Sequence, residues 1–206
     1  MIDQLPTRQG HFLLESGHHG DLWLDLELLC FRPDRVRPFV NELAARLRKY
    51  GAEVVCGPLV EGAFLALMVA SEMGLPFTYS EPLPEEMPAK LYPVRYRLPP
   101  PLCAEVNGKR VAIVNDAINV GSAVRGTFAD LKRCEAEPVA IAALATLTPW
   151  ASRFAETNGL GLEVLASLES EVWTPTACPL CIRGEPLTEP ARAPVQASSS
   201  GPAPGA

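Results

Sequence analysis

Residues 111–123 have the sequence Val-Ala-Ile-Val-Asn-Asp-Ala-Ile-Asn-Val-Gly-Ser-Ala, and this stretch decides the predicted fold. Its apolar start indicates a buried strand at 110–115, whose polar end lies at the sheet edge where open α/β folds bind ligands. A loop at 116–121 leads into a helix whose free N–H groups and dipole favour an anion. Asp116 can accept hydrogen bonds from sugar hydroxyls, so the stretch predicts a sugar-phosphate site. A loop in which Asp116 merely caps the helix is equally compatible.

On both sides of this stretch, strands alternate with helices. The pattern predicts strands at 53–56, 77–80, 139–147 and 162–168, and helices at 36–50 and 63–73. Strands separated by helices favour a parallel sheet of about five strands with right-handed crossovers. Residues 10–29 alternate with period two around a Gly-rich turn and predict an antiparallel hairpin. The proline-rich segment 82–101 predicts an extended loop.

The domain organisation follows from these elements. We expect one domain over residues 1–187, with a hairpin hood at about 10–30, a core at about 34–170 and a C-terminal segment at 171–187. Residues 188–206 are dominated by Pro, Ala, Ser and Gly, cannot form a core, and are predicted to be disordered.

Composition excludes several classes of protein. A length of 206 residues fits one medium domain, and a formal charge of −6 argues against a broad basic face that holds nucleic acid. No signal peptide begins the chain, and the longest apolar runs are too short to span a membrane. Four of the six cysteines are scattered singly, which suits reduced thiols. We therefore expect a cytoplasmic protein without nucleic-acid or membrane partners.

Four separated segments are similar to type I phosphoribosyltransferases, above all to orotate phosphoribosyltransferases. Residues 111–123 resemble the family's signature for phosphoribosyl pyrophosphate (PRPP), and residues 11–25 resemble the N-terminal hood hairpin. Residues 54–63 resemble the pyrophosphate loop, and residues 173–187 the tail of several members. The similarity covers roughly residues 10–187, in order and spacing.

The resemblance implies the type I phosphoribosyltransferase fold, a parallel sheet flanked by helices with a small hood hairpin. It implies a glycosyltransferase that moves phosphoribosyl from PRPP to a nitrogenous base. With orotate the products are orotidine monophosphate and pyrophosphate, a step of pyrimidine nucleotide synthesis. Mg²⁺ would bridge the diphosphate, PRPP and a small base would be the partners, and the chain would form a homodimer.

The site residues are carried over by the same resemblance. The expected PRPP-binding residues are Asn115, Asp116, Ala117, Ile118, Asn119, Val120, Gly121, Ser122 and Ala123. Gly121 would let the backbone approach the 5′-phosphate closely. The expected pyrophosphate loop contains Gly57, Pro58, Glu61, Gly62 and Ala63, and His18 and His19 would lie in the hood at the edge of the base.

Five departures from the family lie where ligands would bind. Asn115 replaces the first acid of the usual pair, Asn119 replaces a Thr, and Glu61 replaces a small residue. Thr148 or a neighbour stands where an arginine usually anchors orotate. The catalytic loop rich in Lys and His is not recognisable, and Arg95 and Arg97 are the catalytic candidates in its place.

These departures leave alternatives open. Arg95 and Arg97 are equally compatible with solvated loop charges. The chain could be a regulatory protein that binds PRPP or nucleotide without turnover, or a transferase for another base.

Two cysteines and two histidines raise the question of a metal. Cys178 and Cys181 have zinc-knuckle or redox spacing, but no second cysteine pair follows, which favours a structural turn. His18 and His19 are adjacent in a turn and point apart, so they are not expected to share an ion. We therefore expect no metal bound by protein side chains alone.

Overall fold

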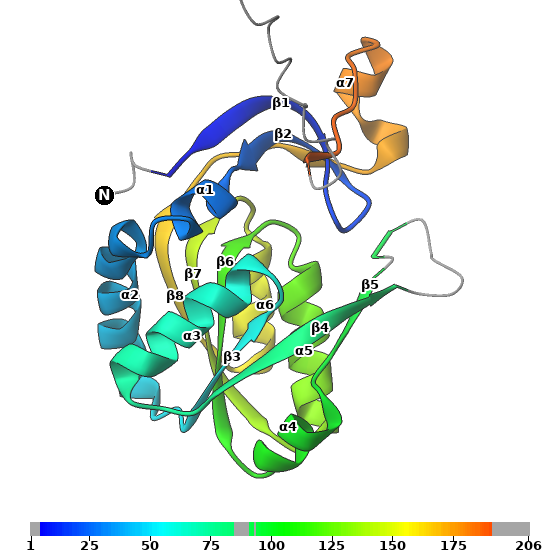
Figure 1. The fold of residues 1–206 in the computed structure, drawn as a ribbon. Coiled ribbons are helices and arrows are strands. Elements are labelled where there is room, and N and C mark those ends of the chain that lie inside the picture. Colours follow the sequence, from blue (N-terminus) through cyan, green and yellow to red (C-terminus); the bar gives the residue numbers. More distant parts are fainter. Residues whose placement is uncertain (1–4, 85–90, 93, 191–206) are drawn as a thin grey trace, which may run out of the picture.

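The computed structural model describes residues 5–84, 91–92 and 94–190. At its centre is a six-stranded sheet in the order β5-β4-β3-β6-β7-β8 (Figure 1). The strands are β3 (Val54–Pro58), β4 (Phe77–Pro84), β5 (Val94–Arg97), β6 (Arg110–Ile118), β7 (Glu137–Thr146) and β8 (Gly161–Ser167). All neighbours pair in parallel except β4 and β5, which are antiparallel. The predicted parallel sheet is thus confirmed, with an antiparallel edge strand added.

Helices cover both faces of this sheet (Figure 1). One side carries α1 (Leu26–Cys30), α2 (Pro33–Leu47), the 3₁₀ turn η2 (Arg48–Tyr50) and α3 (Glu61–Met73); the other carries α4 (Pro100–Glu105), α5 (Ser122–Arg133) and α6 (Trp150–Asn158). Ala112 and Val114 pack into the hydrophobic core on the side of α2 and α3, whereas Val111 and Ile113 pack into the core on the side of α5 and α6. Successive strand residues point to opposite faces, so the unbroken apolar run of β6 supplies both cores.

A second, three-stranded antiparallel sheet lies over the carboxyl end of the first (Figure 1). It contains β1 (Thr7–Leu13), β2 (His19–Leu24) and β9 (Val172–Trp173), followed by η3 (Pro175–Ala177) and α7 (Pro179–Ile182). The C-terminal segment also returns to β1, since Leu13 N donates to Thr188 O and Thr188 N to His11 O. The predicted hairpin is confirmed, and the C-terminal segment pairs with it as far as Thr188.

The prediction of a loop over residues 82–101 is wrong in part. β4 continues to Pro84, β5 pairs with it, and α4 begins at Pro100. Pro82 is tolerated because the recorded pairing of β4 with β3 ends at Ser80, so this end of β4 is paired with β5 alone. A proline at the start of a helix, as in α4, lacks only an N–H that would be unpaired anyway. The short helices α1 and α6 were not predicted.

The prediction of reduced thiols is wrong for one pair. Cys103 and Cys134 form a disulfide whose Cα atoms are 5.2 Å apart, across a sequence separation of 31. The bond joins α4 to the end of α5, a proximity that depends on both helices packing on the same face of the sheet. The cytoplasmic location stays a prediction on its other grounds.

Two further predictions concern membrane-spanning segments and the C-terminal tail. No helix among the described residues has the length and apolarity needed to cross a lipid bilayer. The predicted disorder of the tail falls mostly on residues 191–206, outside the described residues.

Candidate functional site

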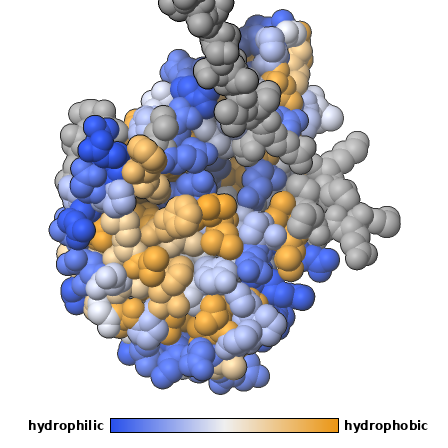
Figure 2. Space-filling view, viewed as in Figure 1, coloured by the Kyte–Doolittle hydropathy of each residue, from blue (hydrophilic) through white to orange (hydrophobic). Residues whose placement is uncertain are grey.

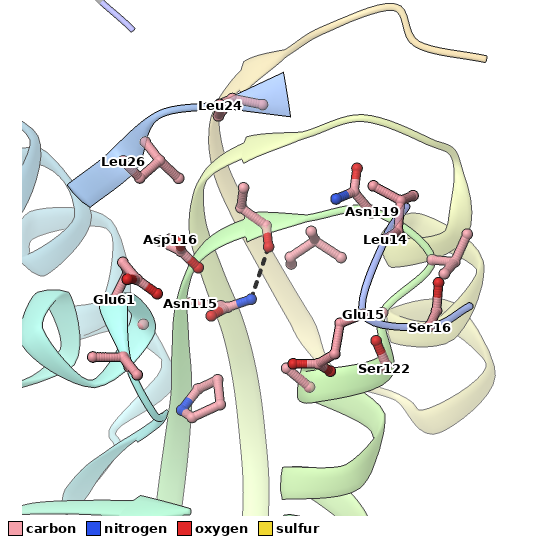
Figure 3. Close-up of a pocket in the computed structure, with 18 of the residues that line it drawn as sticks. Leu14, Glu15, Ser16, Leu24, Leu26, Glu61, Asn115, Asp116, Asn119 and Ser122 are labelled. Atoms are coloured by element: carbon pink, nitrogen blue, oxygen red, sulfur yellow. Dashed lines mark hydrogen bonds between the residues drawn. The ribbon is translucent and has the colours of Figure 1, made fainter. Parts of the chain in front are cut away.

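A cavity of about 190 Å³ opens where β6 ends (Figure 3). Its walls are the end of β6, the first turn of α5, the segment between β3 and α3, and the hairpin above them. All nine residues 115–123 line it, as do Pro58, Glu61 and Gly62. The structure therefore brings the two predicted phosphate-binding segments to one cavity.

The first turn of α5 is shaped by Gly121. This residue is the N-cap, with φ +72° and no side-chain capping hydrogen bond, and Ser122 opens the helix beside the cavity (Figure 3). Glycine adopts this left-handed conformation at little cost. On its inner side, a Cβ atom built on Gly121 would overlap the ring of Trp150. Both backbone angle and packing therefore require glycine here.

Asn119 presents an unusual polar atom to this region. Its Oδ1 is buried and has no hydrogen-bond partner in the described part of the chain. Its backbone oxygen accepts a 2.7 Å hydrogen bond from Thr148 Oγ1, which attaches this loop to the segment between β7 and α6. A buried acceptor without a donor costs roughly 1–3 kcal/mol, and a ligand donor or a cation would remove that cost.

Asn115 has a structural role that sequence reasoning missed. Its Nδ2 donates a 2.8 Å hydrogen bond to Ala117 O, the dashed contact in Figure 3. Its Oδ1 lies so close to Gly62 that a Cβ atom there would overlap it. An aspartate could not donate to Ala117 O. The amide therefore makes a hydrogen bond within the end of β6 and packs closely against Gly62 in α3, a structural role that an aspartate could not fill in the same way.

The charged residues of the cavity are all acidic. Glu15, Glu27, Glu61 and Asp116 line it, whereas no described lining residue is Lys, Arg or His. Burial, with added repulsion from Glu61 and Glu27, raises the pKa of Asp116 to about 7. Burial likewise raises the pKa of Glu61, and Glu27 adds to the effect. Burial first, and mutual repulsion second, therefore favour the protonated form of these two carboxyls relative to an exposed carboxyl.

Glu15, Glu27 and Tyr96 were not singled out from the sequence. Tyr96 is buried, and its hydroxyl donates a 2.6 Å hydrogen bond to Glu15 Oε2, joining β5 to the hairpin. The period-two pattern that marked the two arginines of β5 also marks Tyr96, on the opposite face. The signal was present, but it was assigned to the wrong face.

Arg95 and Arg97 lie on that other face. Both are exposed, and neither lines the cavity, whereas Tyr96 between them does. Alternating residues of a strand point to opposite sides, so both arginines cannot face the cavity while Tyr96 does.

The double change Arg95→Ala with Arg97→Ala tests this placement. If β5 keeps this face toward the cavity when ligands bind, kcat should fall by less than about twofold, as for exposed substitutions. Steady-state kinetics check this. A large fall in kcat with little change in KM would instead show that this segment rotates and brings the two arginines against the ligand during catalysis.

His18 and His19 do not line the cavity either. His18 Nδ1 lies 3.1 Å from Ser16 Oγ, and its ring packs edge-on to Tyr92. His19 is buried, and its Nδ1 lies 3.0 Å from Nε2 of His11. A role for either histidine at the edge of a base stays a prediction.

The chain matches no protein-family model. It is 27% identical over 183 residues to orotate phosphoribosyltransferase of Caldanaerobacter subterraneus subsp. tengcongensis, covering 88% of each chain. It is 29% identical over 182 residues to orotate phosphoribosyltransferase of Thermotoga maritima, covering 88% of this chain and 90% of that one.

Solved structures share the fold. Orotate phosphoribosyltransferase from Aeropyrum pernix matches with a TM-score of 0.60 at 19% identity, over 79% of this chain and 88% of that one. UMP synthase of Leishmania donovani matches with a TM-score of 0.60 at 25% identity, over 81% of this chain but 34% of that longer protein. Adenine phosphoribosyltransferase from Trypanosoma brucei, solved with AMP, pyrophosphate and ribose-5-phosphate, matches with a TM-score of 0.60 at 16% identity, over 77% and 75%. The predicted fold class is confirmed.

Proposed function

We propose that the chain is a type I phosphoribosyltransferase, which transfers the phosphoribosyl group of PRPP to a nitrogenous base and releases pyrophosphate. The observation that carries the proposal is the cavity at the end of β6, which gathers both predicted phosphate-binding segments beneath the hairpin. We propose orotate as the base, since the curated relatives are named for it. The step would belong to pyrimidine nucleotide synthesis.

Each wall of the cavity has a role in this proposal. The N–H groups at the start of α5 would bind the 5′-phosphate, because free amides and the helix dipole favour anions. Asp116 would accept hydrogen bonds from the ribose hydroxyls, and Asn119 Oδ1 would gain the donor it lacks. The segment Gly57–Ala63 would face the pyrophosphate, with Pro58, Glu61 and Gly62 at the surface of the cavity.

The donor set also fits Mg²⁺. Carboxylate and amide oxygens are hard ligands, and the cavity supplies them from Asp116 and Asn119. Bound with PRPP, Mg²⁺ would neutralise charge on the diphosphate. With four carboxylates and a polyanionic substrate in one cavity, this neutralisation is needed for binding.

The acidic lining favours a second candidate, a nucleotide-binding protein of the same fold that has lost turnover. Cations near the leaving group supply much of the rate in reactions that release an anion. Residues 85–90, which hold Lys90 of the predicted catalytic segment, lie outside the described residues.

One assay separates these candidates. The protein is incubated with PRPP, Mg²⁺ and a panel of bases that includes orotate and adenine, and pyrophosphate release is measured. We expect release with orotate. Release only with another base would reassign the substrate, and no release despite PRPP binding by calorimetry would establish the second candidate.

Glu61→Ala should strengthen PRPP binding. The change removes one negative charge next to the expected pyrophosphate position, and relief of about 1.4 kcal/mol of repulsion corresponds to about tenfold tighter binding. Calorimetry at fixed Mg²⁺ measures the change. Glu72→Ala, at the exposed far end of α3, is the matched control and should leave affinity unchanged. Weaker binding by Glu61→Ala would show that this carboxylate holds the metal.

The proposed enzyme forms a homodimer. Val60, which precedes α3, is 51% exposed, and Phe64 and Leu67 within α3 are 49% and 51% exposed. Figure 2 shows an apolar area on the face of the molecule that carries α3. Apolar patches of this kind are typical of subunit interfaces. A second copy is the proposed occupant, because Val60 also lines the cavity and a shared face would complete its wall. Analytical ultracentrifugation should give twice the chain mass, and a monomer at micromolar concentration would contradict the proposal.

A further inference from the structure

A cluster of four side chains lies outside the cavity, at the junction of the hairpin and the C-terminal segment. His11 comes from β1, His19 from β2, and Cys178 and Cys181 lie at the start and within α7. One nitrogen of each histidine and the sulfur of each cysteine all lie within 4.8 Å of one another. Figure 1 shows α7 beside β1 and β2, so segments from both ends of the chain meet at this point.

The distances within the cluster fit a single small cation. His11 Nε2 lies 3.0 Å from His19 Nδ1 and 3.4 Å from Cys178 Sγ. Cys181 Sγ lies 3.7 Å from His11 Nε2 and 3.2 Å from His19 Nδ1. In a tetrahedral zinc site, with bonds of about 2.0–2.3 Å, the ligand atoms are roughly 3.3–3.8 Å apart. Small adjustments therefore suffice to place an ion at the centre.

The far side of His11 gives an independent indication. Its Nδ1 lies 2.9 Å from the backbone oxygen of Glu185. A carbonyl oxygen only accepts, so Nδ1 carries the proton and Nε2 points its lone pair into the cluster. Histidines that bind metals commonly donate their other N–H to a backbone carbonyl, which fixes the ring for coordination.

The burial of three of these four side chains also fits a metal site. His11, His19 and Cys178 are 4%, 6% and 1% exposed, whereas Cys181 faces solvent. Three ligands are thus held by packing, and the fourth lies where an ion would enter. Two imidazoles and two thiols form a donor set typical of Zn²⁺ in a closed, four-coordinate site.

We propose that His11, His19, Cys178 and Cys181 bind one structural Zn²⁺ ion. Both cysteines would bind as thiolates, and their two protons would pass to solvent. With four protein ligands the ion has no open position for substrate, so its role is to join the hairpin to α7. Leu14, Glu15 and Ser16 follow within five residues of His11 and line the cavity, so the ion would fix the part of the hairpin that covers the proposed active site.

The expectation of no metal bound by protein side chains failed to consider His11. It is correct that His18 and His19 point apart and that no second cysteine pair follows. The second pair of ligands comes instead from the two strands of the hairpin, where His11 and His19 face each other with rings 4.9 Å apart.

Metal analysis of the untagged, full-length protein tests the proposal. Elemental mass spectrometry should find one zinc per chain after purification without added metal. His19→Gln should lose the zinc, whereas the adjacent His18→Gln should retain it. Cys181→Ser should lose it, whereas Cys30→Ser should retain it. Zinc kept by the cluster variants, or lost equally by the controls, would overturn the assignment.

A second measurement does not depend on whether the variants fold. The parent protein is reduced, stripped with a chelator and titrated with Co²⁺. Strong visible bands with thiolate-to-cobalt charge transfer are expected for a tetrahedral N₂S₂ site. An octahedral spectrum, a different native metal, or a Cys178–Cys181 disulfide in anaerobically purified protein would each contradict the proposal. Both readouts are independent of catalytic activity.

Discussion

Gly121→Val should destabilise the folded protein by about 2–5 kcal/mol. The left-handed conformation of Gly121 costs a non-glycine residue about 1–2 kcal/mol. A Cβ atom would also overlap Trp150, which stacks on Phe154 at a centroid distance of 4.6 Å. Overpacking of this kind costs about 1–3 kcal/mol more. The melting temperature should therefore fall by about 10 °C.

A matched glycine separates the two causes. Gly159 has φ +66° and nothing within 4 Å of a Cβ atom, so Gly159→Ala measures the backbone cost alone. Gly121→Ala should be the more destabilising of the two by thermal denaturation. Equal losses would mean that Trp150 moves aside at no cost. In that case the glycine serves the approach of a phosphate, as the sequence suggests, and Gly121→Val would lose ligand binding with little loss of stability.

Asp116→Asn should have opposite effects on binding and on stability. Loss of a charged acceptor for the ribose hydroxyls should weaken PRPP binding by up to about a hundredfold, roughly 1–3 kcal/mol. Calorimetry in the presence of Mg²⁺ measures this loss. Unchanged affinity would remove Asp116 from the ligand site.

The ligand-free variant should be the more stable protein at neutral and higher pH. The pKa of Asp116 is raised from an ordinary 3.8 to about 7, so the folded state binds the proton more tightly than the unfolded state. Stability of the parent therefore falls as pH rises from about 4 to about 7, and the asparagine variant avoids this loss. Discounted for contact with solvent in the cavity, the advantage is about 1–2 kcal/mol, or a few degrees.

Melting curves from pH 4 to pH 8 test the sign. The difference between variant and parent should be near zero at pH 4 and reach a plateau above pH 7. Asp34→Asn, at an exposed residue of α2, is the control and should show no such trend. A difference that shrinks as pH rises would show that Asp116 is stabilised as a carboxylate by groups not seen in the cavity.

The sequence predicted the parts of the fold whose cause is local. The apolar run of β6 and the left-handed glycines Gly51 and Gly74, which follow η2 and α3, mark elements that the structure confirms. The stretch 115–123 was also predictable as the wall of a cavity, because the end of one strand and the start of one helix carry it.

Features that need two distant segments were not predictable. The Cys103–Cys134 disulfide depends on how α4 packs beside α5, and the acidity of the cavity sums contributions from the hairpin, α1, α3 and β6. The amide of Asn115 looked like a weakened ligand until Ala117 O and Gly62 were seen beside it. In each case the partner, and not the residue itself, determines the chemistry.

The return of the C-terminal segment to β1 has a consequence for synthesis on the ribosome. Thr188 pairs with His11 and Leu13, and Trp173 pairs with His19, so each pairing closes a loop of about three quarters of the chain or more. Closing so long a loop is slow and entropically costly, and chains emerge from the ribosome N-terminal end first. The hairpin residues are therefore synthesised early, but their pairing with Trp173 and Thr188 can form only after those residues have been synthesised. Until residues 172–188 have been made, the nascent domain has the turn at Gly121 but lacks the completed three-stranded sheet above the cavity.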